Sequence, residues 1–304
     1  MGKKKVLIVA AGSVLGGAIS KCLQIESDFE LLHISSQPFK VPEEVNVNFK
    51  QISALDHKDL RKYCLELLPD YIINTAGLSD PVTCEQNKKL AFDLNVSVAE
   101  NLIRTSVINK THLITFSTDW IFDGKKGSYV EDDKPNPINY YGKTKHNAEN
   151  NVLVNLEKYA IIRLGMVYGK SPAGKEDFIS RAMIAEATDS EVEYMTGLNR
   201  NPTFLEDVAY GVKLIIDKER NGFYNFAGPD IISMSEIVHK VETFLNSKIS
   251  KRKVINQSDI KLKVPANSGL INLKAETDLG MKFLNLESGM VALRHQLSDN
   301  GKYM

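Results

Sequence analysis

The sequence has no excess of one charge and very little cysteine. Its 304 residues include 38 lysines and arginines against 38 aspartates and glutamates, so nothing in the composition suggests nucleic-acid binding or an acidic tail. Only three cysteines occur, Cys22, Cys64 and Cys84, without the paired spacing of a zinc site. Free thiols of this kind are typical of a reducing compartment. We therefore expect a cytoplasmic protein with no nucleic-acid partner and no metal.

Long apolar runs are also lacking. One stretch imitates a secretory signal, because three lysines at residues 3–5 precede an apolar run at residues 6–19. No small-residue cleavage site ends that run, and its removal would delete the first strand of an otherwise regular pattern. No other run approaches the roughly 18 residues of a membrane span. With 43% apolar and 25% charged residues, the composition is that of a globular protein, and we expect no membrane partner.

The residues that are present alternate between two periodicities. Apolar stretches predict strands at residues 5–10, 29–34, 46–52, 70–74, 113–116, 159–163 and 222–226. Helical periodicity predicts helices at residues 14–24, 56–68, 84–108, 141–156, 204–218 and 233–245. Strands alternating with helices predict an α/β fold with a doubly wound, Rossmann-like parallel sheet. After residue 164 the pattern becomes rich in loops, so we expect one domain at 1–164, to which 203–227 return, and a smaller C-terminal lobe formed by 165–202 and 228–304.

Two hydroxyls and a tyrosine–lysine pair follow the predicted strand at residues 113–116. Ser117 and Thr118 stand at its carboxyl end, the edge at which open α/β sheets bind ligands. Tyr141 and Lys145 are four residues apart, which places them on one face of the next helix. A nearby lysine cation lowers the pKa of a phenol, which is ordinarily about 10. These groups predict an acid/base device that interconverts a carbonyl and an alcohol; the alternative is a solvated pair without function.

The similarity of this region to known proteins extends beyond the pair. Ser-Thr-Asp-Trp-Ile-Phe-Asp-Gly at 117–124, Pro-Asn-Pro at 135–137 and Tyr-Gly-Lys-Thr-Lys at 141–145 resemble the dTDP-4-dehydrorhamnose reductases, which are extended short-chain dehydrogenase/reductases. Further similar stretches are Asn-Thr-Ala-Gly at 74–77, Arg-Leu-Gly-Met-Val-Tyr-Gly at 163–169, Asn-Pro-Thr-Phe at 201–204 and Pro-Ala-Asn-Ser at 265–268. The resemblance implies that the first domain binds NAD(P) and that the smaller lobe binds a nucleotide-linked sugar.

The resemblance also implies a reaction. A hydride would pass from NAD(P)H to the C4 carbonyl carbon of a nucleotide-linked 4-keto-deoxysugar. Tyr141 would protonate the new alkoxide, and Lys145 would lower the pKa of Tyr141 and hold the nicotinamide ribose. Thr118 would hydrogen-bond the carbonyl oxygen, with Ser117 as the alternative. The implied substrate contacts are Ser79, Asp119, Trp120, Arg200 and Asn267, and the donor fork of Arg200 would suit a substrate phosphate.

The expected cofactor site departs from the family pattern. The family spaces its first-turn glycines as G-x-x-G-x-x-G, and of these the chain keeps Gly16, with Ala10 and Ser13 at the other places and Gly12 one place early. Small residues still leave room for a pyrophosphate at the helix N-terminus, but the turn geometry that glycine permits becomes less easy. Where the family carries an Asp that reaches the adenine, this chain has Gln51.

The end of the strand at residues 29–34 bears on the choice of cofactor. It carries Ser35 and Ser36 in place of a carboxylate that would bond the ribose hydroxyls of NAD. Hydroxyls tolerate a 2′-phosphate, so the sequence slightly favours NADP over NAD, with Lys40 as a possible phosphate partner. The expected cofactor contacts are Ala10, Gly12, Ser13, Val14, Leu15, Ser35, Ser36, Gln51, Ile52, Ala76, Gly77, Asn95, Ser117, Tyr141 and Lys145; of these, Asn95 would act by holding the backbone near the lysine.

Three alternatives stay open. An epimerase or dehydratase of nucleotide sugars would keep the same Tyr and Lys, although the Pro-Asn-Pro and Phe-Asp-Gly motifs argue against it. A non-catalytic regulatory subunit on the same fold, similar to the methionine adenosyltransferase regulatory subunit, would explain the altered glycine turn, whereas the intact Thr118, Tyr141 and Lys145 oppose it. A reductase with a substrate outside rhamnose synthesis is the third. The resemblance also implies a homodimer formed through helices.

Overall fold

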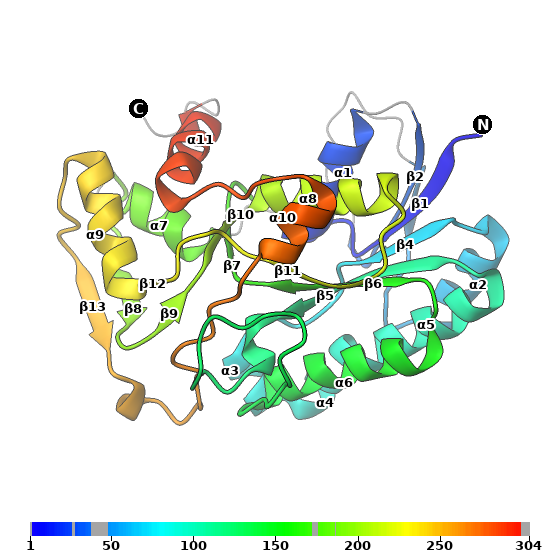
Figure 1. The fold of residues 1–304 in the computed structure, drawn as a ribbon, viewed down its shortest axis with the longest axis horizontal. Coiled ribbons are helices and arrows are strands. Elements are labelled where there is room, and N and C mark those ends of the chain that lie inside the picture. The colour runs from blue at the N-terminus through cyan, green and yellow to red at the C-terminus, as the bar shows by residue number, and fades with distance from the viewer. Residues whose placement is uncertain (1, 26–27, 38–47, 172–175, 186, 299–304) are drawn as a thin grey trace.

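A parallel sheet forms the centre of the protein. A computed structural model describes residues 2–25, 28–37, 48–171, 176–185 and 187–298. The sheet has seven strands in the order β11-β6-β5-β4-β1-β2-β3 (Figure 1). Its strands are β1 Lys4–Val9, β2 Phe29–Ser35, β3 Asn48–Gln51, β4 Tyr71–Asn74, β5 His112–Thr118, β6 Tyr159–Leu164 and β11 Gly222–Phe226. All neighbouring pairs are parallel, and the chain winds outward in both directions from β1, which confirms the predicted doubly wound fold.

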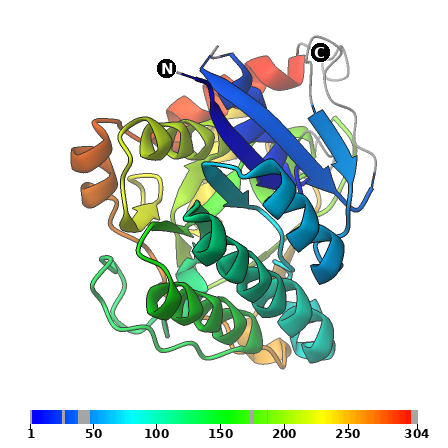
Figure 2. The same cartoon turned by 90° about the vertical axis from the view of Figure 1, so that its right-hand side faces the viewer.

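Helices cover both faces of the sheet (Figure 2). On one face lie α1 Val14–Gln24, α8 Leu205–Asp217 and α10 Leu273–Leu279, and on the other lie α2 His57–Leu67, α5 Val98–Asn109 and α6 Tyr140–Asn155. From Val6 to Val9 the β1 side chains are apolar without interruption because they are buried on both faces of the sheet. Val6 and Ile8 pack toward α1 and α8, while Leu7 and Val9 pack toward α2 and α5, and all four are fully buried. A strand buried on both faces has no polar alternation.

The predicted helix at residues 84–108 is wrong as a single element. The structure has α3 Pro81–Gln86, α4 Lys88–Phe92, a π-helical turn η1 Asp93–Ser97 and then α5. The break falls at Asn87, which ends α3 and whose side chain caps α4 by accepting a hydrogen bond from the Leu90 N–H. Asn is a strong N-cap residue, so it starts a second helix in place of continuing the first.

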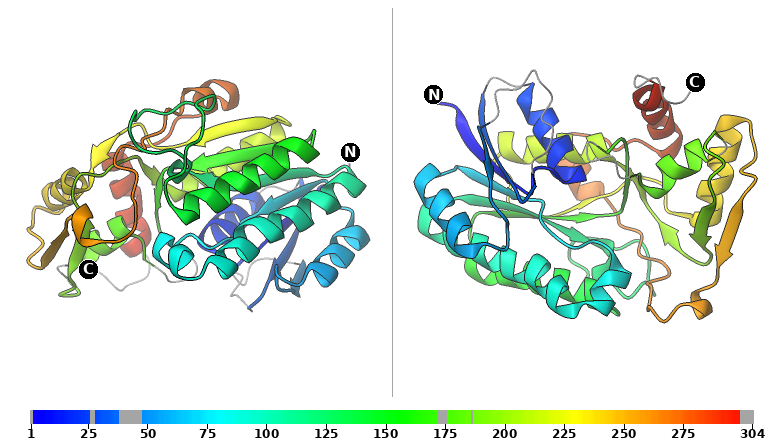
Figure 3. Two further views of the ribbon diagram at one scale, coloured as in Figure 1. Left: turned by 90° about the horizontal axis from the view of Figure 1, so that it is seen from below. Right: turned by 180° about the vertical axis from the view of Figure 1, so that it is seen from behind.

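The rest of the chain forms a smaller lobe beside the carboxyl edge of the sheet (Figure 3). Its core joins α7 Phe178–Ile184, α9 Met234–Leu245 and α11 Leu286–Ser298. Three short pairs accompany them: β7 Met166–Tyr168 with β10 Pro202–Phe204, β9 Asn199–Arg200 with β12 Ile232–Ser233, and β8 Val192–Met195 with β13 Arg252–Ile255. Two 3-10 turns complete the elements of the described residues, η2 Asp119–Ile121 and η3 Gln257–Asp259. No helix of the described residues is long and apolar enough to cross a membrane.

Candidate active site

A cleft of about 600 Å³ opens where the smaller lobe meets the carboxyl ends of the strands. Ten of the predicted site residues line it: Ser13, Val14, Leu15, Ala76, Gly77, Ser79, Ser117, Thr118, Tyr141 and Lys145. They come from the first turn, the loop after β4, the end of β5 and the start of α6. Parallel strands bring their carboxyl ends to one edge, which is why segments so distant in sequence share one cleft.

The first turn is built around a strained alanine. Ala10 has φ of 59°, in the left-handed region that favours glycine. A close approach explains the glycine that the chain does keep, because a Cβ on Gly16 would lie 2.7 Å from the Ala10 carbonyl oxygen and 2.8 Å from Ala11 Cα. The turn thus retains the backbone shape of a glycine-rich turn, at a conformational cost borne by Ala10.

Ser13, the other residue at a glycine position, fixes the turn through its hydroxyl. Its Oγ accepts a hydrogen bond from the Gly16 N–H at 3.0 Å, which caps α1, and donates to Thr75 Oγ1 at 2.9 Å. Thr75 in turn reaches back to the Val9 carbonyl at 2.7 Å. Val14 and Leu15, in the first turn of α1, line the cleft. Helix N-termini offer N–H groups to anions, so a pyrophosphate fits here.

Thr118 and Tyr141 bring two hydroxyls to the lining of the cleft. Thr118 is the last residue of β5, Tyr141 is in the first turn of α6, and both are buried. Burial raises the pKa of the Tyr141 phenol well above its ordinary value, the Thr118 hydroxyl lowers it in part, and the charge of Asp119 raises it further. The phenol is therefore protonated at neutral pH, which is the form that a proton donor requires.

Lys145 lies one turn further along α6. Burial lowers the pKa of its ammonium to about 8, and the charge of Glu149 opposes that shift. A Cβ placed on Gly77 would lie 3.7 Å from Lys145 Nζ and 3.0 Å from Asn95 Oδ1. Because Gly77 has no side chain, space remains beside the Lys145 ammonium. The residues present fit a cofactor ribose at this place.

Asn95 is not among the residues that line the cleft, but it anchors the backbone of one of them, Leu78. The side chain is buried in the π-helical turn. Its Oδ1 accepts from the Leu78 N–H at 2.7 Å, and its Nδ2 donates to the Leu78 carbonyl at 3.1 Å and to Thr144 Oγ1 at 3.0 Å. It thereby joins the loop after β4 to the helix that carries Tyr141 and Lys145.

The expected adenosine-side residues lie together at the ends of β2 and β3. Ser35 pairs with Gln51 in the parallel register, and the Gln51 side chain donates to the Ser36 carbonyl at 3.1 Å. Ile52 is buried beside them. These four residues, like Ala10 and Gly12, are not among the residues that line the cleft. Lys40 lies outside the described residues.

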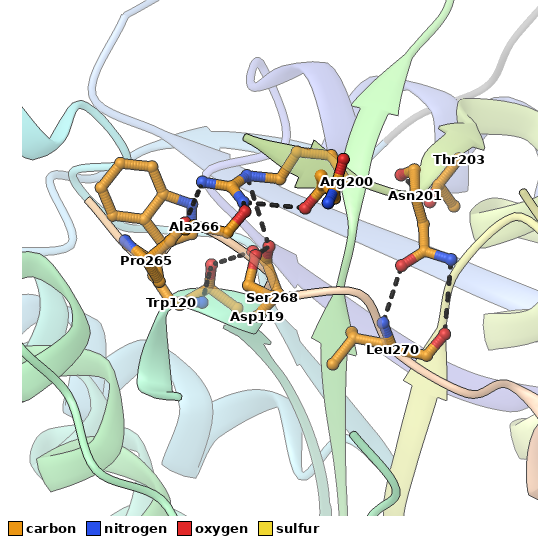
Figure 4. A network of polar contacts seen from close by, with 11 residues as sticks. Asp119, Trp120, Arg200, Asn201, Thr203, Pro265, Ala266, Ser268 and Leu270 are labelled. Carbon is orange, nitrogen blue, oxygen red and sulfur yellow. Dashed lines mark hydrogen bonds and ion pairs between the residues drawn. The ribbon is translucent and has the colours of Figure 1, made fainter. Parts of the chain in front are cut away.

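Four of the five expected substrate contacts lie outside the cleft lining, and only Ser79 is part of it. Asp119 and Arg200 are buried, and the guanidinium binds inward, to the Pro265 and Ala266 carbonyls and within 3.9 Å of Asp119 Oδ2 (Figure 4). The Arg200 guanidinium lies over the Trp120 ring, with Cζ 5.6 Å from the ring centroid. Asn267 Oδ1 accepts a hydrogen bond from Asn199 Nδ2 at 2.5 Å. In this structure Arg200 has internal partners in place of the phosphate that the sequence suggested.

Comparison with known proteins defines the family. The model of the RmlD substrate binding domain family matches residues 4–298. The chain belongs to this family. This confirms the resemblance to the dTDP-4-dehydrorhamnose reductases, and the fold agrees: the reductase from Bacillus anthracis in complex with NADP superimposes with a TM-score of 0.84 at 20% identity, covering 97% of this chain and 99% of that chain.

Curated relatives of this chain have different names. Methionine adenosyltransferase 2 subunit beta of Rattus norvegicus is 27% identical over 281 residues, which is 90% of this chain and 82% of the relative. The probable low-salt glycan biosynthesis reductase Agl14 of Haloferax volcanii is 24% identical over 302 residues, with 96% and 98% of the two chains covered. Similar chains thus include a named reductase and a subunit of a different enzyme.

Several cleft residues were missed by the sequence analysis: Thr75, Leu78, Leu164, Gly165, Val167, Tyr168, Gly169, Glu176 and Asp177. Residues 164–169 belong to the family-like stretch at 163–169, to which the sequence analysis assigned no site residue. The signal that could have revealed them is their place directly after β6, because the residues that follow a parallel strand stand at the ligand-binding edge.

Proposed function

We propose that the protein is an NADPH-dependent reductase of a nucleotide-linked 4-keto-deoxysugar. The observation that carries this proposal is the convergence of Thr118, Tyr141 and Lys145 on one cleft with the first turn of α1. Such a set of a buried protonated phenol, a hydroxyl and an ammonium suits proton delivery to a carbonyl oxygen. Family membership and the presence of a reductase among the relatives support it.

Each residue of the site has its own role in the proposed reaction. NADPH would supply the hydride when bound. Val14 and Leu15 at the N-terminus of α1 would hold its pyrophosphate, and Lys145 would hold its nicotinamide ribose. Thr118 orients the substrate carbonyl oxygen, and Tyr141 donates its proton to that oxygen as the alcohol forms. Residues 165–169 of the smaller lobe close the cleft on the sugar side.

The cofactor preference is tested by adding a charge. We propose NADP over NAD because Ser35 and Ser36 at the end of β2 offer hydroxyls to a 2′-phosphate. A Ser35→Asp variant places a carboxylate where it would repel that phosphate and bond a ribose hydroxyl. We expect this variant to lose NADPH affinity by at least tenfold, while NADH affinity stays the same or rises. A uniform loss for both cofactors would argue against 2′-phosphate recognition at this strand end.

A second candidate function follows from the relatives. The chain is 27% identical to methionine adenosyltransferase 2 subunit beta over most of both lengths, and Ala10 and Ser13 replace two glycines at the turn. We therefore consider a regulatory subunit that binds an enzyme partner on the same fold. This candidate predicts stable association with a catalytic subunit and no turnover of a keto sugar.

The deciding experiment is titration of the purified protein with NADPH and NADH, followed by fluorescence and by thermal unfolding. Saturable binding raises stability by about 2.7 kcal/mol at 100 times the dissociation constant. Binding followed by NADPH oxidation with a dTDP-4-keto-deoxysugar supports the reductase. Binding without oxidation of NADPH by any nucleotide-linked keto sugar favours the regulatory subunit. No binding of either cofactor contradicts the reductase.

We also propose that the protein is a cytoplasmic homodimer that pairs through α5 and α6. These neighbouring helices expose Val107, Ile108, Leu153 and Val154, of which Val154 is 84% exposed. An Ile108→Lys, Val154→Lys double variant is expected to sediment as a monomer. Its control is Tyr210→Lys on α8, which exposes an aromatic ring elsewhere and should leave the oligomeric state unchanged. A monomeric parent protein would contradict the proposal.

A further inference from the structure

Two buried side chains of opposite charge join α6 to the neighbouring strand. Glu149 is on α6 and Arg163 is on β6, and each is 2% exposed. Arg163 Nε and Nη2 donate to the two carboxylate oxygens of Glu149, both at 3.0 Å. Two parallel hydrogen bonds of this kind fix the orientation of a carboxylate as well as its distance.

Arg163 is itself held from the other side. Its Nη1 donates to the Glu131 carbonyl at 2.7 Å, and its guanidinium lies over the Phe223 ring, with Cζ 4.4 Å from the ring centroid. Each of the three guanidinium nitrogens thus has an acceptor. An arginine fixed in this way cannot turn away from Glu149 without losing several bonds. The carboxylate therefore has one fixed place between α6 and β6.

Glu149 lies one turn beyond Lys145 on the same face of α6. Side chains four residues apart on a helix have Cβ atoms about 5–6 Å apart. Helical side chains also lean toward the helix N-terminus, so the Glu149 side chain leans toward the turn that carries Lys145. The interaction between a carboxylate and an ammonium at this spacing is one of charge across a buried interior, and it needs no direct hydrogen bond.

We propose that Glu149 is a positioning residue: clamped by Arg163, it sets a fixed negative charge one helical turn from Lys145 and keeps that amine protonated. The clamp matters because a buried carboxylate without a partner takes up a proton and loses its charge. A protonated Lys145 offers three donors to a ribose and favours the phenolate that Tyr141 becomes after it has given up its proton. The catalytic part of this inference rests on the proposed reductase function.

The titratable groups around Lys145 agree with this role. Burial lowers the pKa of Lys145 to about 8, while Glu149 from α6 and Cys84 from α3 oppose that shift. Burial raises the pKa of the Cys84 thiol to about 11, so the thiol is neutral at physiological pH. Glu149 is therefore the anion that acts on the ammonium.

The titratable groups around Glu149 keep it ionised. They are Arg163 from β6 and His146 from α6, whose Nδ1 lies 3.8 Å from Glu149 Oε2. Burial raises the pKa of the Glu149 carboxyl group, but these two neighbours outweigh burial and leave the pKa below its ordinary value. The carboxylate is thus charged at neutral pH, as the proposal requires.

The pKa of Lys145 in the free protein tests the proposal directly. Lysine labelled with carbon-13 at Cε gives an NMR signal that follows the charge of each amine, and Lys145→Arg identifies the Lys145 signal by its loss. With Glu149→Gln, which keeps the size of the side chain and an oxygen that accepts from Arg163, we expect the Lys145 pKa to fall by about one unit. An unchanged Lys145 pKa in the folded variant would overturn the proposal.

A double variant keeps the test valid where the single variant fails to fold. Glu149→Gln leaves the buried Arg163 charge without a carboxylate, which is destabilising. Glu149→Gln combined with Arg163→Met removes both charges, and replacement of a buried ion pair by uncharged groups is often tolerated. The Lys145 pKa should still lie below the parent value, by less than in the single variant because the opposing guanidinium is also gone. A return to the parent value would show a purely structural pair and overturn the proposal.

The matched control is Glu100→Gln. Glu100 is on the neighbouring helix α5, and its Oε1 accepts a hydrogen bond from Asn151 Nδ2 of α6 at 3.1 Å. The control thus also removes one carboxylate charge that bonds α6, but further along the helix from Lys145. It should leave the Lys145 pKa unchanged. An equal fall in Glu100→Gln and Glu149→Gln would overturn the proposal, because no specific counter-charge would then exist.

These readouts separate the inference from the proposed function. The titration of Lys145 requires neither cofactor nor turnover, so it decides the role of Glu149 also in a protein that reduces no keto sugar. In an active reductase, Glu149→Gln should move the alkaline limb of the pH profile of kcat/KM toward lower pH by as much as the Lys145 pKa falls. Below both pKa values the variant should bind NADPH as tightly as the parent. An unshifted profile despite a lowered Lys145 pKa would overturn the catalytic part of the inference.

Discussion

Ala10 has a backbone conformation that L-amino acids rarely adopt, and this leads to a stability prediction at the scale of one residue. The left-handed region costs an alanine about 1–2 kcal/mol, whereas glycine adds about 0.4–1 kcal/mol of chain entropy to the unfolded state. Ala10→Gly should therefore raise the free energy of unfolding by up to about 1 kcal/mol, measured by urea denaturation. Ala11→Gly is the control, since Ala11 is fully buried and not in the left-handed region. Destabilisation of equal size in both variants would mean that the turn is not strained.

Tyr141 carries the proposed chemistry in a single hydroxyl group. Tyr141→Phe keeps the ring that packs against Trp120 at 6.0 Å but removes the proton donor. We expect turnover to fall by at least a hundredfold, while NADPH affinity stays within a few fold. Steady-state kinetics and a fluorescence titration measure the two quantities. Tyr140→Phe, which alters the neighbouring tyrosine, is the control and should retain activity. Normal turnover in Tyr141→Phe would refute the proposed mechanism.

At the scale of elements, the π-helical turn places Asn95 between two parts of the cleft. Asn95→Ala removes three side-chain hydrogen bonds to the Leu78 backbone and Thr144. We expect a loss of about 2–3 kcal/mol in unfolding free energy and weaker NADPH binding, because the loop at residues 76–79 loses its anchor. Asn101→Ala is the matched control: Asn101 is buried on α5 and bonds the His57 carbonyl at 3.2 Å. If both variants weaken cofactor binding equally, the effect of Asn95 is general destabilisation.

At the scale of the whole molecule, Asp207 connects α8 to the segment before α11. Its Oδ2 accepts from the Leu284 N–H at 2.8 Å, and burial raises the pKa of the carboxyl group to about 6. The ordinary pKa is about 3.9, so between pH 4 and 6 the unfolded chain releases a proton that the folded protein keeps. Stability is therefore lost as pH rises through this window, and the penalty is full above pH 6.

Asp207→Asn removes this penalty while its amide oxygen can still accept from Leu284. We expect the variant to unfold at a higher temperature than the parent at pH 8, by a stability gain on the order of 1 kcal/mol after allowance for partial exposure, and at nearly the same temperature at pH 4. Calorimetry at both pH values measures the difference. Asp217→Asn, on the last turn of the same helix, is the control and should show no such gain. A gain that is equal at both pH values would contradict the titration of Asp207.

Much of the fold followed from local patterns because each pattern has a local cause. The apolar runs of β1 and β5 are buried on both faces, and the predicted helix at residues 14–24 has the same bounds as α1. Ser233, predicted as the start of a helix, is the N-cap of α9 in a capping box with Glu236. The single helix predicted at residues 84–108 was wrong because periodicity continues across Asn87, while its side chain caps a new helix.

The sequence by itself determined the order of strands and helices and placed Thr118, Tyr141 and Lys145 at the carboxyl edge of the sheet, because strand ends and helix faces follow from spacing alone. Only the tertiary structure decided what those groups meet. Ser268 and Arg200 approach Asp119 across 149 and 81 residues of chain, and burial sets the direction of the pKa shifts of Tyr141 and Lys145. Contacts between distant segments and the exclusion of water depend on how the two lobes pack, and no local pattern contains that information.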